Sequence, residues 1–264
     1  MAQVLAISNQ KGGVGKTTTA VNLAACLAAA GQKILLIDLD PQGNASSGLG
    51  VDKAGVAHTI YEVIMGGLPL EETFCDTVIH DLTVAPANTD LVGAELELTS
   101  ALAREHRLSD AVDAVRGQFD YVLIDCPPSL GLLTVNALTA ADMVLVPLQA
   151  EYYALEGLGE LTRTIQLIKQ RLNPALSWEG VVLTLYDGRN RLSQQVEADV
   201  RDHLGDKVFQ TIIPRNVRLG EAPSFGEPII TYDPRAKGAQ AYRDLARELL
   251  DRGDHGLARV TRSA

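Results

Sequence analysis

Short runs of apolar residues alternate with longer amphipathic stretches along most of the chain. The short runs predict buried β-strands and the longer stretches predict helices between them, which is typical of βαβ units. The pattern therefore predicts an α/β fold in which a mainly parallel, twisted sheet has helices on both faces. The predicted strands are 4–8, 34–39, 83–85, 121–124, 143–147, 181–185 and 209–213. The predicted helices are 16–30, 90–98, 108–116, 155–172, 194–204 and 239–250.

The chain contains no internal repeat, low-complexity tract or linker rich in Pro and Ser. We therefore expect its 264 residues to form a single domain. The last stretch, from about residue 252, loses the hydrophobic period and is expected to fray. No apolar run approaches the roughly 18 residues of a spanning helix, and no leader is evident, so we expect no membrane contact.

Net charge and amino-acid composition exclude or disfavour several classes of protein. The formal net charge is -10, which excludes a globally basic nucleic-acid binder but leaves room for a local basic patch. Three widely spaced cysteines without a CxxC pair disfavour a disulfide framework or a thiolate metal site, and a cytoplasmic location fits best. Aromatic residues make up only 5% of the chain, which disfavours a stacking platform for single strands.

A glycine-rich loop, QKGGVGKTTT, lies between the first predicted strand and the first predicted helix. Glycines let successive N–H groups point inward around an anion, and the helix N-terminus adds positive potential. Lys16 supplies a cation for terminal phosphates and the Thr17 hydroxyl a ligand for Mg²⁺. The motif predicts a P-loop nucleoside triphosphatase, whereas the alternative is a glycine turn with a solvated lysine. The predicted cofactor-binding residues of the loop are Gly12, Gly13, Val14, Gly15, Lys16, Thr17 and Thr18.

Acidic residues end two of the predicted strands. Asp38 and Asp40 close the segment ILLIDLD, and Asp125 closes YVLID, which has the form of a Walker B strand. Carboxylates beside a phosphate loop can hold magnesium-bound water and orient an attacking water. The predicted metal residues are Thr17, Asp38 and Asp125, and the alternative for each acid is a cap on the next helix.

The loop departs from the ordinary pattern G-x-x-x-x-G-K-[ST], because Gln10 occupies the first glycine position and Lys11 precedes the glycines. This form resembles the deviant Walker A loop of the ParA/MinD family of ATPases. The resemblance implies that Lys11 reaches across a dimer interface to the partner's nucleotide. The alternative for Lys11 is an exposed loop cation.

Further segments resemble the chromosomal ParA (Soj) branch: DPQGNASSGLG, PANTDLVGAELEL, DCPPSLGLLTVNALTAAD, QAEYYALEGL, IPRNVRLGEAPSFGEPI and YDPRAKGAQAY. The resemblance implies a DNA-partitioning ATPase with ATP and Mg²⁺ as cofactors. It also implies an ATP-bound homodimer that binds double-stranded DNA without sequence preference. A ParB-type centromere-binding partner would stimulate the weak hydrolysis of ATP and release the protein, which would be cytoplasmic and nucleoid-associated.

The resemblance also assigns roles to individual residues. It makes Lys11, Lys16 and Asp40 the catalytic residues, with Asp40 positioning the hydrolytic water and Asp38 supporting the magnesium shell. A carboxylate beside a bound phosphate suits both tasks.

Outside the loop, the resemblance places Pro214 and Asn216 at the adenine and Glu151 at the partner's nucleotide. It makes Arg189 and Arg218 the DNA-binding residues. The alternatives are turn formation for Asn216, a helix N-terminal acid for Glu151 and local ion pairs for the two arginines.

Two other function classes share the phosphate loop. A MinD-like membrane-site positioning ATPase would need a basic, bulky amphipathic tail, whereas GLARVTRSA is short and poor in apolar residues. A metabolic P-loop synthetase or kinase would act on a small acid without DNA, and the additional lysine weighs against it.

Overall fold

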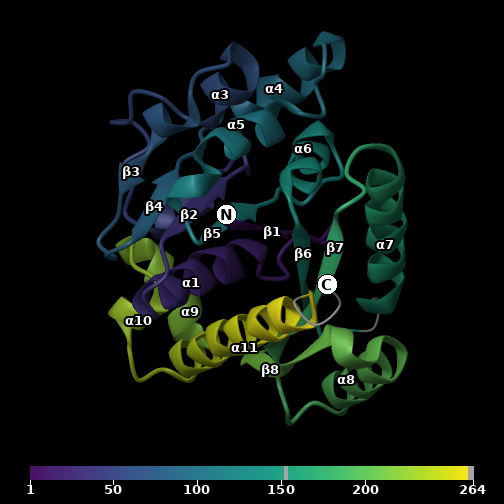
Figure 1. Cartoon of the computed structure of the whole chain (residues 1–264). Coiled ribbons are helices and arrows are strands. Elements are labelled where there is room, and N and C mark those ends of the chain that lie inside the picture. The colour runs from purple at the N-terminus through teal and green to yellow at the C-terminus, as the bar shows by residue number, and fades with distance from the viewer. Residues whose placement is uncertain (152–153, 261–264) are drawn as a thin grey trace.

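A computed structural model gives the structure of residues 1–151 and 154–260, shown in Figure 1. An eight-stranded sheet runs through the molecule in the order β3-β4-β2-β5-β1-β6-β7-β8. All neighbouring strands are parallel except β3, which is antiparallel to β4. The strands are β1 (Gln3–Ile7), β2 (Ile34–Asp38), β3 (Cys75–Asp76), β4 (Leu82–Ala85), β5 (Tyr121–Asp125), β6 (Met143–Gln149), β7 (Ser177–Tyr186) and β8 (Val208–Pro214).

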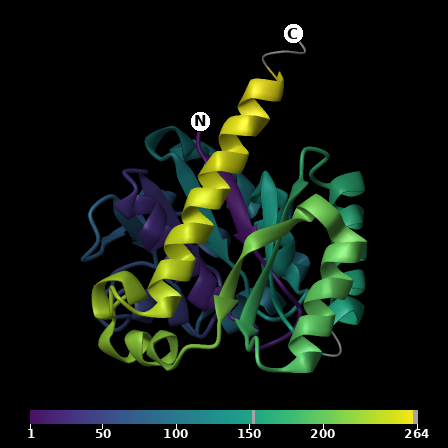
Figure 2. The same cartoon turned by 90° about the horizontal axis from the view of Figure 1, so that it is seen from below.

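Helices cover both faces of the sheet (Figures 1 and 2). One buried cluster joins the sheet to α1, α2, α9, α10 and α11, and a second joins it to α3, α4, α5, α6, α7 and α8. Strand β1 shows why two layers form: Val4 and Ala6 enter one cluster while Leu5 and Ile7 enter the other, because successive side chains point to opposite faces. The arrangement confirms the predicted fold class. The helices are α1 (Lys16–Ala29), α2 (Asn44–Gly48), α3 (Ile60–Gly66), α4 (Leu91–Glu97), α5 (Arg107–Val115), α6 (Leu132–Ala140), α7 (Ala154–Arg171), α8 (Arg191–Leu204), α9 (Val217–Glu221), α10 (Ile229–Tyr232) and α11 (Lys237–Val260).

The last helix was predicted to span 239–250, and this boundary was wrong, whereas fraying from about residue 252 stays a prediction. Helix α11 continues to Val260. Where the hydrophobic period stops, Arg252 fixes the helix to β7 and β8. Its guanidinium donates to Val208 O at 3.2 Å and to Glu179 O at 3.3 Å, and it lies 3.8 Å from the centroid of the Phe209 ring. A cation that packs on an aromatic ring can anchor a helix without an apolar stripe.

Strand β8 forms one outer edge of the sheet, and α11 protects part of it. The Glu248 carboxylate accepts hydrogen bonds from Gln210 N at 2.8 Å and Thr211 N at 2.9 Å. Burial alone would raise the pKa of Glu248, but these backbone donors and Arg252 outweigh it and lower the pKa. An ionised side chain thus satisfies two N–H groups that an edge strand would otherwise leave unpaired.

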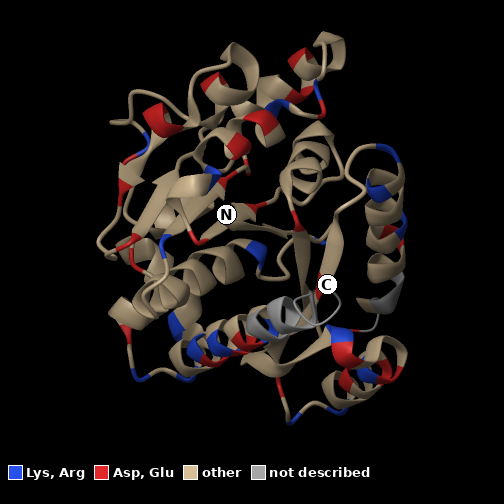
Figure 3. Ribbon diagram, in the orientation of Figure 1, with Lys and Arg blue, Asp and Glu red and all other residues tan. Residues whose placement is uncertain are grey.

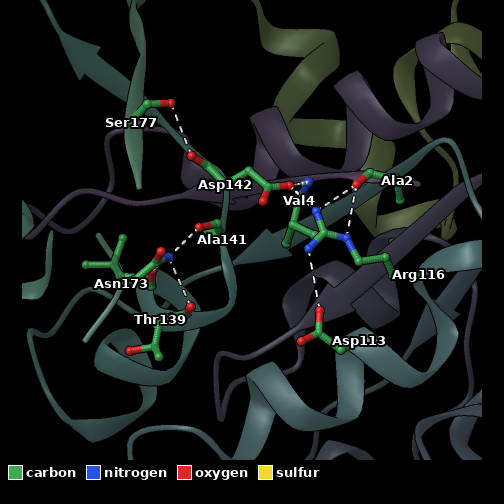
Figure 4. A network of polar contacts seen from close by, with 10 residues as sticks. Ala2, Val4, Asp113, Arg116, Thr139, Ala141, Asp142, Asn173 and Ser177 are labelled. Carbon is green, nitrogen blue, oxygen red and sulfur yellow. Dashed lines mark hydrogen bonds and ion pairs between the residues drawn. The ribbon is translucent and has the colours of Figure 1, made fainter. Parts of the chain in front are cut away.

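A polar network fixes the amino-terminal ends of the strands (Figure 4). The Asp142 carboxylate accepts a hydrogen bond from Val4 N at 2.9 Å and pairs with Arg116, which also donates to Ala2 O at 2.9 Å. The backbone oxygen of Asp142 accepts from Ser177 N at 2.9 Å. The beginnings of β1, β6 and β7 are thereby tied together, and the polar groups of the candidate site lie at the opposite, carboxyl-terminal edge.

Candidate functional site

The glycine-rich loop joins the end of β1 to α1, as predicted. Gly13 and Gly15 have left-handed backbones with φ of 73° and 86°, where a side chain would introduce strain. The loop is held from the neighbouring strands: Thr184 Oγ1 donates to Val14 O at 2.8 Å, and Asn9 Nδ2 donates to Pro147 O at 2.8 Å. Its shape is therefore built into the fold before any ligand enters.

Lys16 begins α1 and is 7% exposed. Its Nζ donates to the backbone oxygen of Lys11 at 3.1 Å, so the side chain curls back over the loop. Burial lowers the pKa of Lys16, and the negative charges of Asp125 and Asp40 partly oppose that shift. A partly desolvated ammonium without a direct carboxylate partner favours the binding of an anion beside it.

Asp125 lies at the centre of the carboxyl edge, because β5 runs between β1 and β2. In register it faces Ile7 on one side and Asp38 on the other. The carboxylate is fully buried, and neither oxygen has a hydrogen-bond partner. Burial raises the pKa of Asp125 well above its usual range and the charge of Asp38 adds to this; the nearby Thr17 hydroxyl opposes the shift without reaching hydrogen-bond geometry. A buried acceptor with no partner, next to a hydroxyl and an ammonium, fits a site that a cation completes.

Asp38 is also fully buried, but its oxygens have partners. Oδ2 accepts from Ser46 N at 2.8 Å and from Ser46 Oγ at 2.7 Å, and Oδ1 accepts from Asp40 N at 3.2 Å. Burial raises the pKa of Asp38 to about 6, and these donors limit the rise. The side chain therefore positions the segment from Asp40 to Ser46, and its place in a magnesium shell stays a prediction.

Asp40 reaches the cleft over the loop and is 9% exposed. A cleft of about 320 Å³ is lined by Gly12, Gly13, Gly15, Lys16, Thr17, Thr18, Asp40, Asn44, Pro128 and Leu185. The structure thus brings Asp40 together with the phosphate-loop residues, as the sequence predicted. Among the described residues no three His, Cys, Asp or Glu side chains form a ready-made metal cluster.

A second cavity of about 480 Å³ adjoins this cleft. It is lined by Gly15, Thr18, Thr184, Leu185, Ile213, Pro214, Arg215, Asn216, Val217, Leu219, Gly220, Glu221 and Tyr242. Pro214 and Asn216 were predicted to contact a base, and the structure places both beside the loop. Asn216 also caps α9, since its Oδ1 accepts from Arg218 N at 2.9 Å, which leaves the amide nitrogen for a base.

The sequence did not single out Tyr242, Thr184 or Leu185 for this cavity. Tyr242 is fully buried in α11, and its hydroxyl lies 3.2 Å from Thr19 Oγ1 of α1. In the sequence it looks like an ordinary core residue of an amphipathic helix. Its partner Thr19 lies 223 residues away on α1, so no local pattern in the sequence indicates that Tyr242 lines the cavity.

Lys11 and Glu151, both expected at a partner's nucleotide, contact each other. Lys11 Nζ lies 2.6 Å from Glu151 Oε2, with the two side chains 41% and 46% exposed. Gln149 donates to the other oxygen of Glu151. In the single chain the additional lysine of the loop is therefore held in an ion pair at the surface.

The two predicted DNA-binding arginines lie in separate segments and each has a carboxylate partner. Arg189, in the loop between β7 and α8, binds both oxygens of Asp187 at 3.0 Å and lowers the pKa of that carboxyl to about 2. Arg218 in α9 donates to Glu221 Oε2 at 2.8 Å. Figure 3 shows that basic and acidic residues also alternate along α8 and α11. The local ion pairs considered as the alternative are present, and both arginines stay accessible, with exposed fractions of 92% and 54%.

None of the described helices combines the length and apolar character needed to cross a membrane.

The loop, the acids at the ends of β2 and β5 and the parallel sheet define a P-loop nucleoside triphosphatase. The family described as an AAA domain matches residues 2–178. The chain is 57% identical to the chromosome partitioning protein ParA of Caulobacter vibrioides, with 95% of this chain and 94% of that protein covered. It is 53% identical to the sporulation initiation inhibitor protein Soj of Bacillus subtilis, with 96% and 100% covered. The chain belongs to the ParA/Soj family of chromosome-partitioning ATPases.

A solved structure with the same fold carries another name. The cobyrinic acid a,c-diamide synthase of Mycobacterium smegmatis, solved with ADP and magnesium, has a TM-score of 0.85 and 41% identity to this chain, and the match covers 97% of both chains. Its size and architecture match over nearly the whole length, which supports the predicted fold independently of the sequence patterns.

Proposed function

We propose that this chain is a DNA-partitioning ATPase whose ATP-bound dimer binds DNA and is released after hydrolysis. The observation that carries the proposal is the loop with two lysines: Lys16 is buried beside the unpartnered Asp125, whereas Lys11 points outward to Glu151. Lys16 would thus serve the chain's own phosphate site, and the exposed Lys11 would reach a partner after leaving Glu151. The high identity to ParA and Soj proteins supports the same function.

The residues fit ATP and Mg²⁺. The loop N–H groups and Lys16 would hold the phosphates, and Thr17 and Asp125 would hold the ion, which supplies charge neutralisation of the phosphates when bound. Asp40 lies in the same cleft and would orient the attacking water. Pro214 and Asn216 would contact the adenine in the adjoining cavity.

Dimer formation would exchange one ion pair for another. Lys11 would leave Glu151 and reach the partner's nucleotide, while Glu151 would be free to contact that nucleotide as well. A charge-assisted contact to phosphate is stronger than an exposed pair, because it is shielded from water between two subunits.

DNA binding would depend on a few local basic residues, because the net charge of -10 makes the chain as a whole repel DNA. Arg189 and Arg218 would exchange their carboxylate partners for DNA phosphates, and a dimer presents two copies of each. A ParB-type protein would stimulate hydrolysis and release the dimer from the nucleoid in the cytoplasm. Residues 1–264 would act as a single ATPase domain throughout this cycle.

A metabolic synthetase is the second candidate, because a protein of that name shares this fold and 41% of its residues. It would amidate or phosphorylate a small acid and ignore DNA. A membrane-positioning ATPase would instead bind lipid vesicles in the presence of ATP.

The deciding experiment measures binding to nonspecific duplex DNA with ATP, with ADP and without nucleotide, at two salt concentrations, with the mass determined in parallel. We expect a dimer and salt-sensitive DNA binding with ATP alone. Arg218→Ala should dimerise normally and lose DNA affinity. Arg104→Ala is the matched control, because Arg104 is also ion-paired, to Glu105 at 2.9 Å, but lies just before α5. ATP binding without any DNA binding would contradict the proposal and favour the other two candidates.

A further inference from the structure

Leu185, near the end of β7, has a backbone conformation that a leucine rarely adopts. Its φ is 51°, in the left-handed region where an L side chain crowds the backbone. Among the described residues, only Asp81 and Ala103 are further non-glycine residues with positive φ. A strained residue persists only where the surrounding structure enforces it, and such residues gather at ligand-binding sites.

A β-bulge imposes this conformation. Leu183 pairs with Ile212 and Tyr186 pairs with Pro214, so three steps along β7 match two steps along β8. The additional residue on β7 bends the strand and turns the side chain at that position away from the regular alternation. The bulge thus determines where the Leu185 side chain is placed.

Leu185 lies where three cavities meet. It lines the nucleoside cavity of about 480 Å³, the phosphate cleft of about 320 Å³ and a third cavity of about 420 Å³. The third cavity is polar: its lining includes Glu151, Asp187, Ser193 and Arg215. Leu185 is therefore shared by the nucleoside cavity, the phosphate cleft and the polar cavity.

We propose that Leu185 is a wall of the nucleotide site, which contacts the nucleoside and closes it off from the polar cavity. Glycine would adopt the same backbone without strain but would leave no wall between the cavities. The inference rests on the proposed function only in that a nucleoside triphosphate occupies the cleft. It does not depend on DNA or on a dimer.

Three substitutions separate the side chain from the backbone. Leu185→Ala removes the wall and keeps the strain, Leu185→Gly removes both, and Leu185→Met keeps an apolar side chain of similar volume. Ala103→Gly is the matched control, because Ala103 has the same φ of 51° and lines none of the three cavities. Calorimetric titration gives the affinities for ATP and ADP, and thermal unfolding without nucleotide gives the stability.

We expect Leu185→Ala and Leu185→Gly to bind both ATP and ADP about tenfold more weakly, because the lost apolar contact is with the nucleoside and not with the terminal phosphate. Leu185→Gly should nevertheless unfold about 2–4 °C above Leu185→Ala, since it relieves the backbone strain. Leu185→Met should bind ATP within about threefold of the wild type. Ala103→Gly should gain stability and bind ATP normally.

Recovered ATP affinity in Leu185→Gly would overturn the inference, because affinity would then follow backbone strain and the role would be structural. If Leu185→Ala and Leu185→Gly bind ATP as tightly as the wild-type chain does, the inference about Leu185 is overturned and the proposed function is not affected. A wild-type chain that fails to bind ATP would overturn the proposed function as well.

Discussion

Lys16 and Asp125 are opposite charges that lie near each other without forming an ion pair. Lys16 donates to the loop carbonyl of Lys11, and both oxygens of Asp125 lack partners. Their pKa values are displaced in the directions that favour the neutral forms, because burial penalises each charge. A ligand that brings its own anions and a cation relieves both penalties together, which is the physical reason that these residues suit a magnesium–phosphate complex.

We expect Lys16→Ala to lower ATP affinity by about 100-fold or more, because a charge-assisted contact in a water-poor site is lost. The measurement is a calorimetric titration with ATP, with circular dichroism to verify folding. Lys53→Ala is the control, since Lys53 also donates to a loop carbonyl, that of Gln42 at 2.8 Å, but lies outside the phosphate loop. Tight ATP binding by folded Lys16→Ala would contradict the assignment.

At the scale of elements, the sequence predicted the buried strands and the loop because each has a local signature: an apolar run, or glycines with a lysine. It missed α6, Leu132–Ala140, because nearly all of that helix is buried and it has no polar face to give a period. It also missed β3, which has two residues. The roles of Tyr242 and Leu185 depend on residues from distant strands and helices, and no local pattern carries that information.

The contact between α11 and β8 predicts a pH-dependent stability. The pKa of Glu248 is lowered in the fold, so its contribution is complete above the unfolded value of 4.5 and is lost as the pH falls below it. We expect Glu248→Gln to cost about 1 kcal/mol at pH 7, because glutamine can accept from only one of the two N–H groups and the site is partly exposed.

Urea unfolding at pH 7, 5 and 4 measures this cost. The difference between wild type and Glu248→Gln should shrink at the lowest pH, as the wild-type carboxylate becomes protonated. A difference that stays constant over the whole range would show that the charge of Glu248 contributes nothing to the edge of the sheet.

At the scale of the molecule, parallel strands separate two kinds of polar group. The amino-terminal edge has the closed network around Asp142 (Figure 4), whereas the carboxyl-terminal edge has Asp125 and the loop. The network around Asp142 is closed by its own hydrogen bonds, whereas both oxygens of Asp125 lack a partner. Lys11 differs from both groups, because it is ion-paired to Glu151 but remains exposed to solvent.

On the proposed cycle, Lys11→Ala should still bind ATP but remain a monomer, because only the contact across the interface is lost. Glu151→Ala should leave Lys11 free without removing it, and should retain more dimer than Lys11→Ala. Light scattering with ATP gives the mass of each variant. A dimer formed by Lys11→Ala as readily as by the wild type would refute the role of Lys11 across the interface.

The pair between Lys11 and Glu151 has a consequence for how salt affects the protein. Dissolved ions weaken this exposed pair inside the single chain, whereas the contact that would replace it is shielded between two subunits and is weakened less, so this exchange would not make the dimer sensitive to salt. On the proposed cycle Arg189 and Arg218 would also leave carboxylate partners. Each contact to a DNA phosphate would in addition release counterions condensed on the DNA, so DNA binding would weaken steeply with salt. Raising the ionic strength should therefore strip DNA from the ATP-bound dimer before it separates the two subunits, and a salt titration would resolve two steps that coincide at low ionic strength.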